Sequence, residues 1–177
     1  MDPAHLHLMV NHVPILGAFL SLPLIGIAAW RRAEKAPALS YATLLTIAAI
    51  GAVVSLRSGS PAEERVEDLP GVSEHWIEEH EERAETATAF AVITALGALG
   101  ALAYGWKREE GTPAVLTGAV FVGALATSGA MGWTGLAGGQ IHHPELRADG
   151  GQSVTPEGGR GGEAGETKEE EEEEGER

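Results

Sequence analysis

The apolar residues of this chain gather in four long blocks, and the charged residues stand near the ends of the blocks or between them. Each block has about the 20 residues that an α-helix needs to cross a hydrocarbon core of about 30 Å. The blocks are rich in Ala, Gly and Leu, and glycine is tolerated better in membrane helices than in soluble ones. The pattern predicts an all-α membrane protein, a bundle of four transmembrane helices at about residues 10–30, 37–56, 84–106 and 113–137.

The segments that connect the predicted helices differ in charge. The two short connections, at residues 31–35 and 107–110, carry five of the twelve basic residues of the chain. Basic residues in short loops favour the cytoplasmic side, and Trp30 and Trp106 stand directly before them, as members of an interfacial aromatic belt would. We therefore expect the N-terminus and the C-terminus to lie on the outer side of the membrane.

Acidic residues are concentrated in the loop after the second block and at the end of the chain. We expect residues 1–147 to form the transmembrane domain and residues 148–177, rich in Gly and Glu, to form a disordered tail. The net charge of −14 excludes nucleic acid as an expected partner, since binding it needs a basic surface. The chain has no cysteine, which excludes disulfides, iron–sulfur ligation and covalent c-type haem attachment.

All seven histidines fall at or beyond the outer ends of the predicted helices. An even number of helices separates the three groups, so they share one membrane face whichever way the protein is inserted. The seven are His5, His7, His12, His75, His80, His142 and His143.

Helical spacing distinguishes these histidines from one another. We expect a helix that begins after Ser73 to carry His80 on one face with a stripe of alanines, and small residues mark close helix–helix approach in membranes. His80 should therefore point into the bundle, whereas His75 should face water. We expect His5 and His7 to be interfacial or to form an adventitious metal site, and Pro14 to kink the first helix.

Imidazole is a ligand of haem iron and of several transition metals. The first hypothesis is a b-type haem held by His12 and His80 near the outer face. The second is a transition-metal site in which carboxylates join the imidazoles, formed by His12, His80, His142, His143, Glu63, Glu64 and Glu67. The third is an accessory or structural subunit of a membrane complex without a cofactor.

Several classes of function are disfavoured by the pattern. No charged residue or histidine lies in the middle of a block, where pumps and coupled transporters usually keep one. The chain has no phosphate-binding loop, no Gly-x-Ser-x-Gly segment and no His-Glu-x-x-His segment. We identify no catalytic residues, and we expect any chemistry to lie at the outer face.

Three segments carry a resemblance to a known family. The stretch from His7 to Ile15 resembles the opening His-Pro-x-x-Val-His-Phe-Pro-Ile of a family of uncharacterised four-helix bacterial inner-membrane proteins. His80 and the segment 132–139 are similar to its third-helix His and its Gly-Trp-x-Gly-x-x-Gly-Gly ending. Some members are fused to Rieske or cytochrome c domains. The resemblance implies an inner (plasma) membrane location and association with a membrane redox complex, although Leu6 and Leu8 replace the family's usual prolines.

Overall fold

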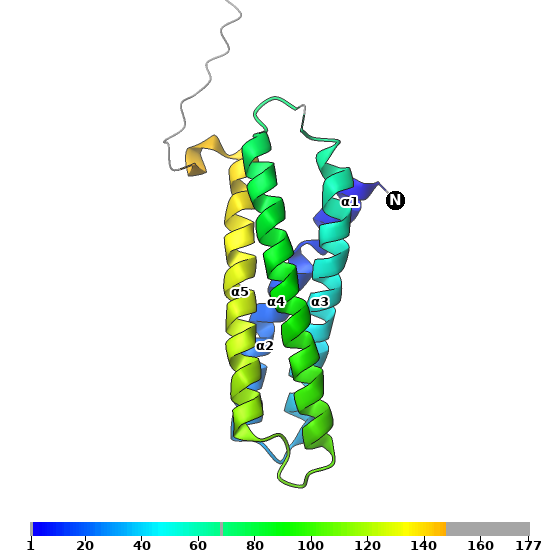
Figure 1. The fold of residues 1–177 in the computed structure, drawn as a ribbon, viewed down its shortest axis with the longest axis vertical. Helices are drawn as coiled ribbons and strands as arrows, with labels where there is room; N and C mark the ends of the chain where they lie inside the picture. Colours follow the sequence, from blue (N-terminus) through cyan, green and yellow to red (C-terminus); the bar gives the residue numbers. More distant parts are fainter. Residues whose placement is uncertain (1, 68, 148–177) are drawn as a thin grey trace, which may run out of the picture.

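A computed structural model describes residues 2–67 and 69–147 as a bundle of long, nearly parallel helices (Figure 1). No strand occurs in the described part of the chain. The elements in order are α1 (Pro3–Val10), α2 (His12–Trp30), α3 (Lys35–Glu63), α4 (Glu74–Trp106), α5 (Ala114–His142) and the short 3-10 helix η1 (Pro144–Leu146).

Four helices are long and apolar enough to cross a membrane, with α1 and α2 together forming the first. The predicted all-α, four-helix fold is therefore confirmed, and the protein is a multi-pass membrane protein. The predicted acidic tail, residues 148–177, lies outside the described residues.

The helices extend beyond the predicted bounds at the end of the bundle that carries the histidines. The second membrane helix was expected to end at about residue 56, and this bound is wrong, because α3 continues through Ser58-Gly59-Ser60-Pro61 to Glu63. Pro61 stands in the last turn, so its missing N–H leaves only the carbonyl of Arg57 without its helical partner. We call this end, formed by α1, the C-terminus of α3, the N-terminus of α4 and the C-terminus of α5, the histidine end.

A bend at Asn11 separates α1 from α2. Pro14 has no N–H to donate to the carbonyl of Val10, and its ring crowds that carbonyl. The predicted kink is confirmed. Beyond the bend, α1 packs on α3 (Figure 1), and the Asp2 carboxylate both accepts a 2.9 Å bond from the Ala4 N–H and pairs with Arg65 at 3.1 Å.

Small residues bring the helices close together. Ala87, Ala91, Ala95 and Ala98 are all buried, which confirms the predicted alanine stripe on α4. Where α2 meets α3, a Cβ added at Gly17 would stand 2.8 Å from the Cβ of Ala48. Such approach lets the backbones pack without large side chains.

Aromatic and basic side chains mark both ends of the bundle. At the end formed by the two short connections, Arg31 lies 5.4 Å from the ring centre of Trp30. At the histidine end, the Arg83 guanidinium lies 4.6 Å from the ring centre of Trp133 and 5.9 Å from that of Trp76. Trp and Tyr collect at membrane–water interfaces. Both ends of the bundle therefore carry the aromatic and basic side chains that are typical of a membrane–water interface.

Candidate functional site: a histidine cavity at one end of the bundle

A cavity of about 490 Å³ lies at the histidine end, among α1, α2, α3, α4 and α5. It forms where α1 bends toward α3, and the α5 turn carrying Met131 and Thr134 lines it too. Twelve of its lining side chains are apolar. Nine are polar, and they are His7, Asn11, His12, Ser55, Glu63, His80, Glu81, Thr134 and His142.

The imidazole of His7 reaches from α1 to the main chain of α3. Its Nδ1 lies 3.0 Å from the carbonyl oxygen of Ser55 and 3.4 Å from the Ser58 hydroxyl. The same hydroxyl donates to the Ser55 carbonyl at 3.0 Å. A carbonyl only accepts, so Nδ1 of His7 carries the proton in this bond. The contact fixes the ring at the cavity wall.

The imidazole of His80 makes an equivalent contact between α4 and α5. Its Nδ1 lies 2.9 Å from the carbonyl oxygen of Thr134, and the side chain is half-buried. Because a carbonyl only accepts, Nδ1 of His80 also carries the proton in this bond. The prediction that His80 points into the bundle is confirmed, and so is the exposure of His75.

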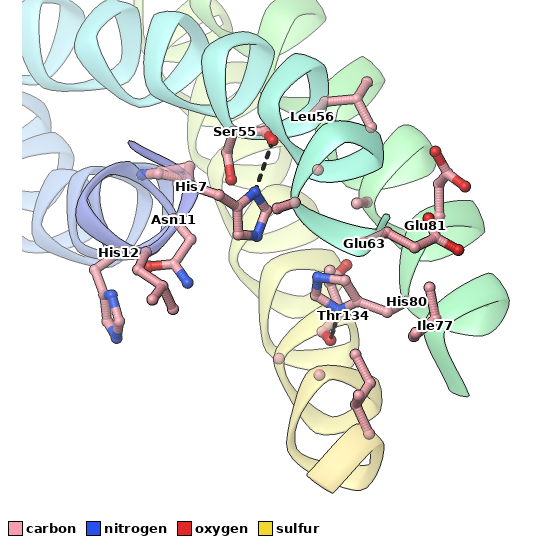
Figure 2. A pocket seen from close by; sticks show the side chains of 18 of the residues that line it. His7, Asn11, His12, Ser55, Leu56, Glu63, Ile77, His80, Glu81 and Thr134 are labelled. Atoms are coloured by element: carbon pink, nitrogen blue, oxygen red, sulfur yellow. Dashed lines mark hydrogen bonds between the residues drawn. The ribbon is translucent and has the colours of Figure 1, made fainter. Parts of the chain in front are cut away.

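Both rings project into the same cavity, as Figure 2 shows, His7 from the side of α1 and His80 from the side of α4. In the neutral form of each ring, a proton on Nδ1 leaves Nε2 with a free lone pair. Metal-binding histidines usually donate their other ring N–H to a carbonyl or carboxylate, which fixes tautomer and orientation. His7 and His80 both have this arrangement.

The other candidate histidines lie at the edge of the cavity or outside it. The side chain of His12 is exposed, and in Figure 2 its ring points away from His7 and His80. His142 is exposed at the rim. His143 bonds the Glu145 carboxylate at 2.8 Å in solvent. The backbone N–H of Glu145 and this ring hold the pKa of the Glu145 carboxyl below its ordinary value.

The predicted carboxylate ligands also differ in whether they line the cavity. Glu63 lines the cavity and is half-buried, whereas Glu64 and Glu67 are exposed. Glu81 lines the cavity as well and accepts a 2.9 Å bond from the Ser60 hydroxyl. Within residues 2–67 and 69–147, no group of three or more His, Cys, Asp or Glu side chains is placed to hold a metal ion.

His7 was expected to be interfacial or part of an adventitious metal site, and the sequence pattern did not place it in the cavity. The chain nevertheless carries a pattern that the His7 and His80 contacts share. Ser55 and Gly59 stand four residues apart on α3, and Thr134 and Gly138 stand four residues apart on α5. In both helices, the first residue offers its carbonyl to an imidazole and a glycine follows four residues later. At Gly138 an added Cβ would crowd the His80 ring, whereas at Gly59 it would make ordinary contact with His7.

Comparisons of the chain with protein-family models, with curated proteins and with solved structures found no match.

Proposed function

We propose that this membrane protein binds b-type haem in the histidine cavity, with the Nε2 atoms of His7 and His80 as iron ligands. One observation carries the proposal. Two imidazoles from different helices are fixed through Nδ1 to main-chain carbonyls, and both face one apolar cavity. The proposal keeps His80 and replaces His12 by His7, because the His12 side chain is exposed.

The residues of the cavity suit a large apolar group. Ile15, Ile77 and Met131 line the wall, and such side chains exclude water from a bound ring system. A b-type haem needs no covalent attachment, and the imidazoles of His7 and His80 together with apolar packing would hold it. When bound, it supplies one-electron transfer. The chain's own residues hold the two ring nitrogens in place and set the polarity around them.

The resemblance to inner-membrane proteins found fused to Rieske or cytochrome domains supports the same setting. We propose that the protein works beside a membrane redox complex, with the histidine end on the outer side of a bacterial inner membrane. The basic connections at the opposite end of the bundle support this orientation.

The proposal is tested on protein purified from haem-replete cells without chelators. The wild-type protein should show a Soret band and bind about one haem per chain, and the His80→Ala variant should lose both. His75→Ala is the matched control, because it removes an exposed histidine from the same helix. A colourless wild-type preparation from such cells contradicts the proposal.

A second candidate function is transition-metal binding, and the position of Glu63 favours it. This half-buried carboxylate lines the same cavity as the two fixed imidazoles, and carboxylate and imidazole are both ligands of zinc and other divalent metals. The three groups are not placed as a ready ligand set in the described residues, so a metal ion would have to draw Glu63 toward the imidazoles. Metal analysis of the same sample separates the candidates. About one metal ion per chain without a Soret band, reduced in Glu63→Gln, supports the metal site. Less than about half an equivalent of any transition metal argues against it.

A further inference from the structure

The two fixed imidazoles are held by the same local device. On α3, Ser55 provides the carbonyl and Gly59 follows four residues later. On α5, Thr134 provides the carbonyl and Gly138 follows four residues later. In an α-helix, the N–H of residue i+4 meets the carbonyl of residue i, so a side chain at i+4 stands beside that carbonyl. Glycine at this position opens the carbonyl to a second donor.

The two devices differ in how tightly the ring is held. A Cβ added at Gly138 would stand 3.1 Å from both Cε1 and Nδ1 of His80. A Cβ added at Gly59 would stand 3.8 Å from Cε1 and 3.9 Å from Nδ1 of His7, which is ordinary van der Waals contact. Only the α5 device leaves no room for a methyl group.

We infer that Gly138 is a positioning residue, which sets where the His80 imidazole lies and thereby how its Nε2 meets a bound group. This inference rests on the proposed function of the cavity. A methyl group at 138 pushes the ring by a few tenths of an ångström. The push acts on the atom that donates to the Thr134 carbonyl, so the fixed tautomer and the direction of Nε2 change together.

The substitution separates positioning from folding. Alanine is a better helix former than glycine, so Gly138→Ala does not weaken α5 through helix propensity. Gly132→Ala on the same helix is the matched control, because a Cβ there meets nothing within 4 Å. Gly59→Ala is the third variant. Gly59 follows Ser55 as Gly138 follows Thr134, but a Cβ at Gly59 would make only ordinary van der Waals contact with His7.

The first measurement uses cofactor-free protein and the nitrogen-15 spectrum of the imidazoles. Wild type and Gly132→Ala should show His80 as a neutral ring protonated on Nδ1. Gly138→Ala should lose this tautomer or mix it with the other. An unchanged His80 signal in Gly138→Ala overturns the inference. Because the protein is cofactor-free, this readout does not depend on whether the protein is able to bind haem.

The second measurement uses the haem-loaded protein. Gly138→Ala should raise the dissociation constant for haem on the order of tenfold, the usual scale for loss of support behind a ligand, and should convert part of the low-spin spectrum to high-spin. Gly59→Ala should change less. Equal changes in Gly59→Ala and Gly138→Ala, or none in Gly138→Ala, contradict the inference. A wild-type protein that binds no haem contradicts the proposed function instead.

Discussion

His7 and His80 stand on different helices, yet each gives its Nδ1–H to a main-chain carbonyl of a neighbouring helix. The carbonyl cannot move without unwinding its helix, so it holds the ring more firmly than a mobile side chain would. Both rings thus keep Nε2 available without the entropy cost of ordering two free imidazoles at the moment of binding.

The proposed ligand pair, His7 and His80, leads to a prediction that distinguishes His7 from His12. His7→Ala should weaken haem binding by at least about tenfold, because one ligand and its support are lost. His12→Ala should leave binding near the wild-type level, since the His12 side chain is exposed. Haem titration of the two variants, followed at the Soret band, checks this. A larger loss of haem affinity in His12→Ala than in His7→Ala would instead support His12 and His80 as the ligand pair, as the sequence suggests.

The direction of the His80 side chain, into the bundle, was predictable from the sequence, and the position of His7 was not. His80 continues a stripe of alanines at spacings of three and four, and such a stripe fixes its direction. His7 precedes the bend at Asn11, so its direction depends on the bend angle and on the packing of α1 against α3. Neither quantity can be deduced from spacing in the sequence.

At the scale of elements, the bend between α1 and α2 makes the cavity. Pro14→Ala restores the missing N–H and removes the crowded ring, so a continuous helix becomes favourable. α1 should then leave α3, and haem affinity should fall on the order of tenfold through the loss of the His7 ligand. Pro23→Ala in α2 is the control, because Pro23 is exposed and away from the cavity. Equal affinities in both variants would show that the bend does not form the site.

Close helix packing gives a prediction about stability. Gly17→Ala places a methyl group 2.8 Å from the Ala48 Cβ and 3.1 Å from the Leu44 carbonyl oxygen, so it should destabilise the bundle by about 1–3 kcal/mol. Gly26→Ala on the same helix meets nothing within 4 Å and should be neutral or stabilise by about 0.5–1 kcal/mol. Unfolding of both variants in detergent measures the difference. A Gly17→Ala variant as stable as wild type contradicts the close approach of α2 and α3.

The membrane spans themselves were predictable because hydropathy and length report them directly. The extra turns of α3 at the histidine end were not, because residues 58–61 have the composition of a loop, yet α3 passes through them. The start of α4 was predictable, since a helix was expected to begin after Ser73 and α4 begins at Glu74. At the histidine end, the Ser60–Glu81 and Asp2–Arg65 contacts link helix ends that the sequence places far apart.

At the scale of the whole molecule, the distribution of basic residues predicts which end faces outward. The chain has no cysteine, so single cysteines introduced by mutation report topology without a background. A cysteine at exposed Glu64 should react with a membrane-impermeant maleimide in intact cells. A cysteine at exposed Glu109 should react only after the membrane is opened. The reverse pattern would invert the orientation and leave the histidines together on the other face.

We propose that one haem would be held by both His7 and His80. Near-infrared magnetic circular dichroism of the oxidised protein tests it most directly, because the charge-transfer band distinguishes two imidazoles from imidazole with methionine, and Met131 also lines the cavity. We expect the bis-imidazole band in wild type and in His12→Ala, and its loss in His7→Ala. An imidazole–methionine band in wild type, or a bis-imidazole band that survives in His7→Ala, would contradict the account.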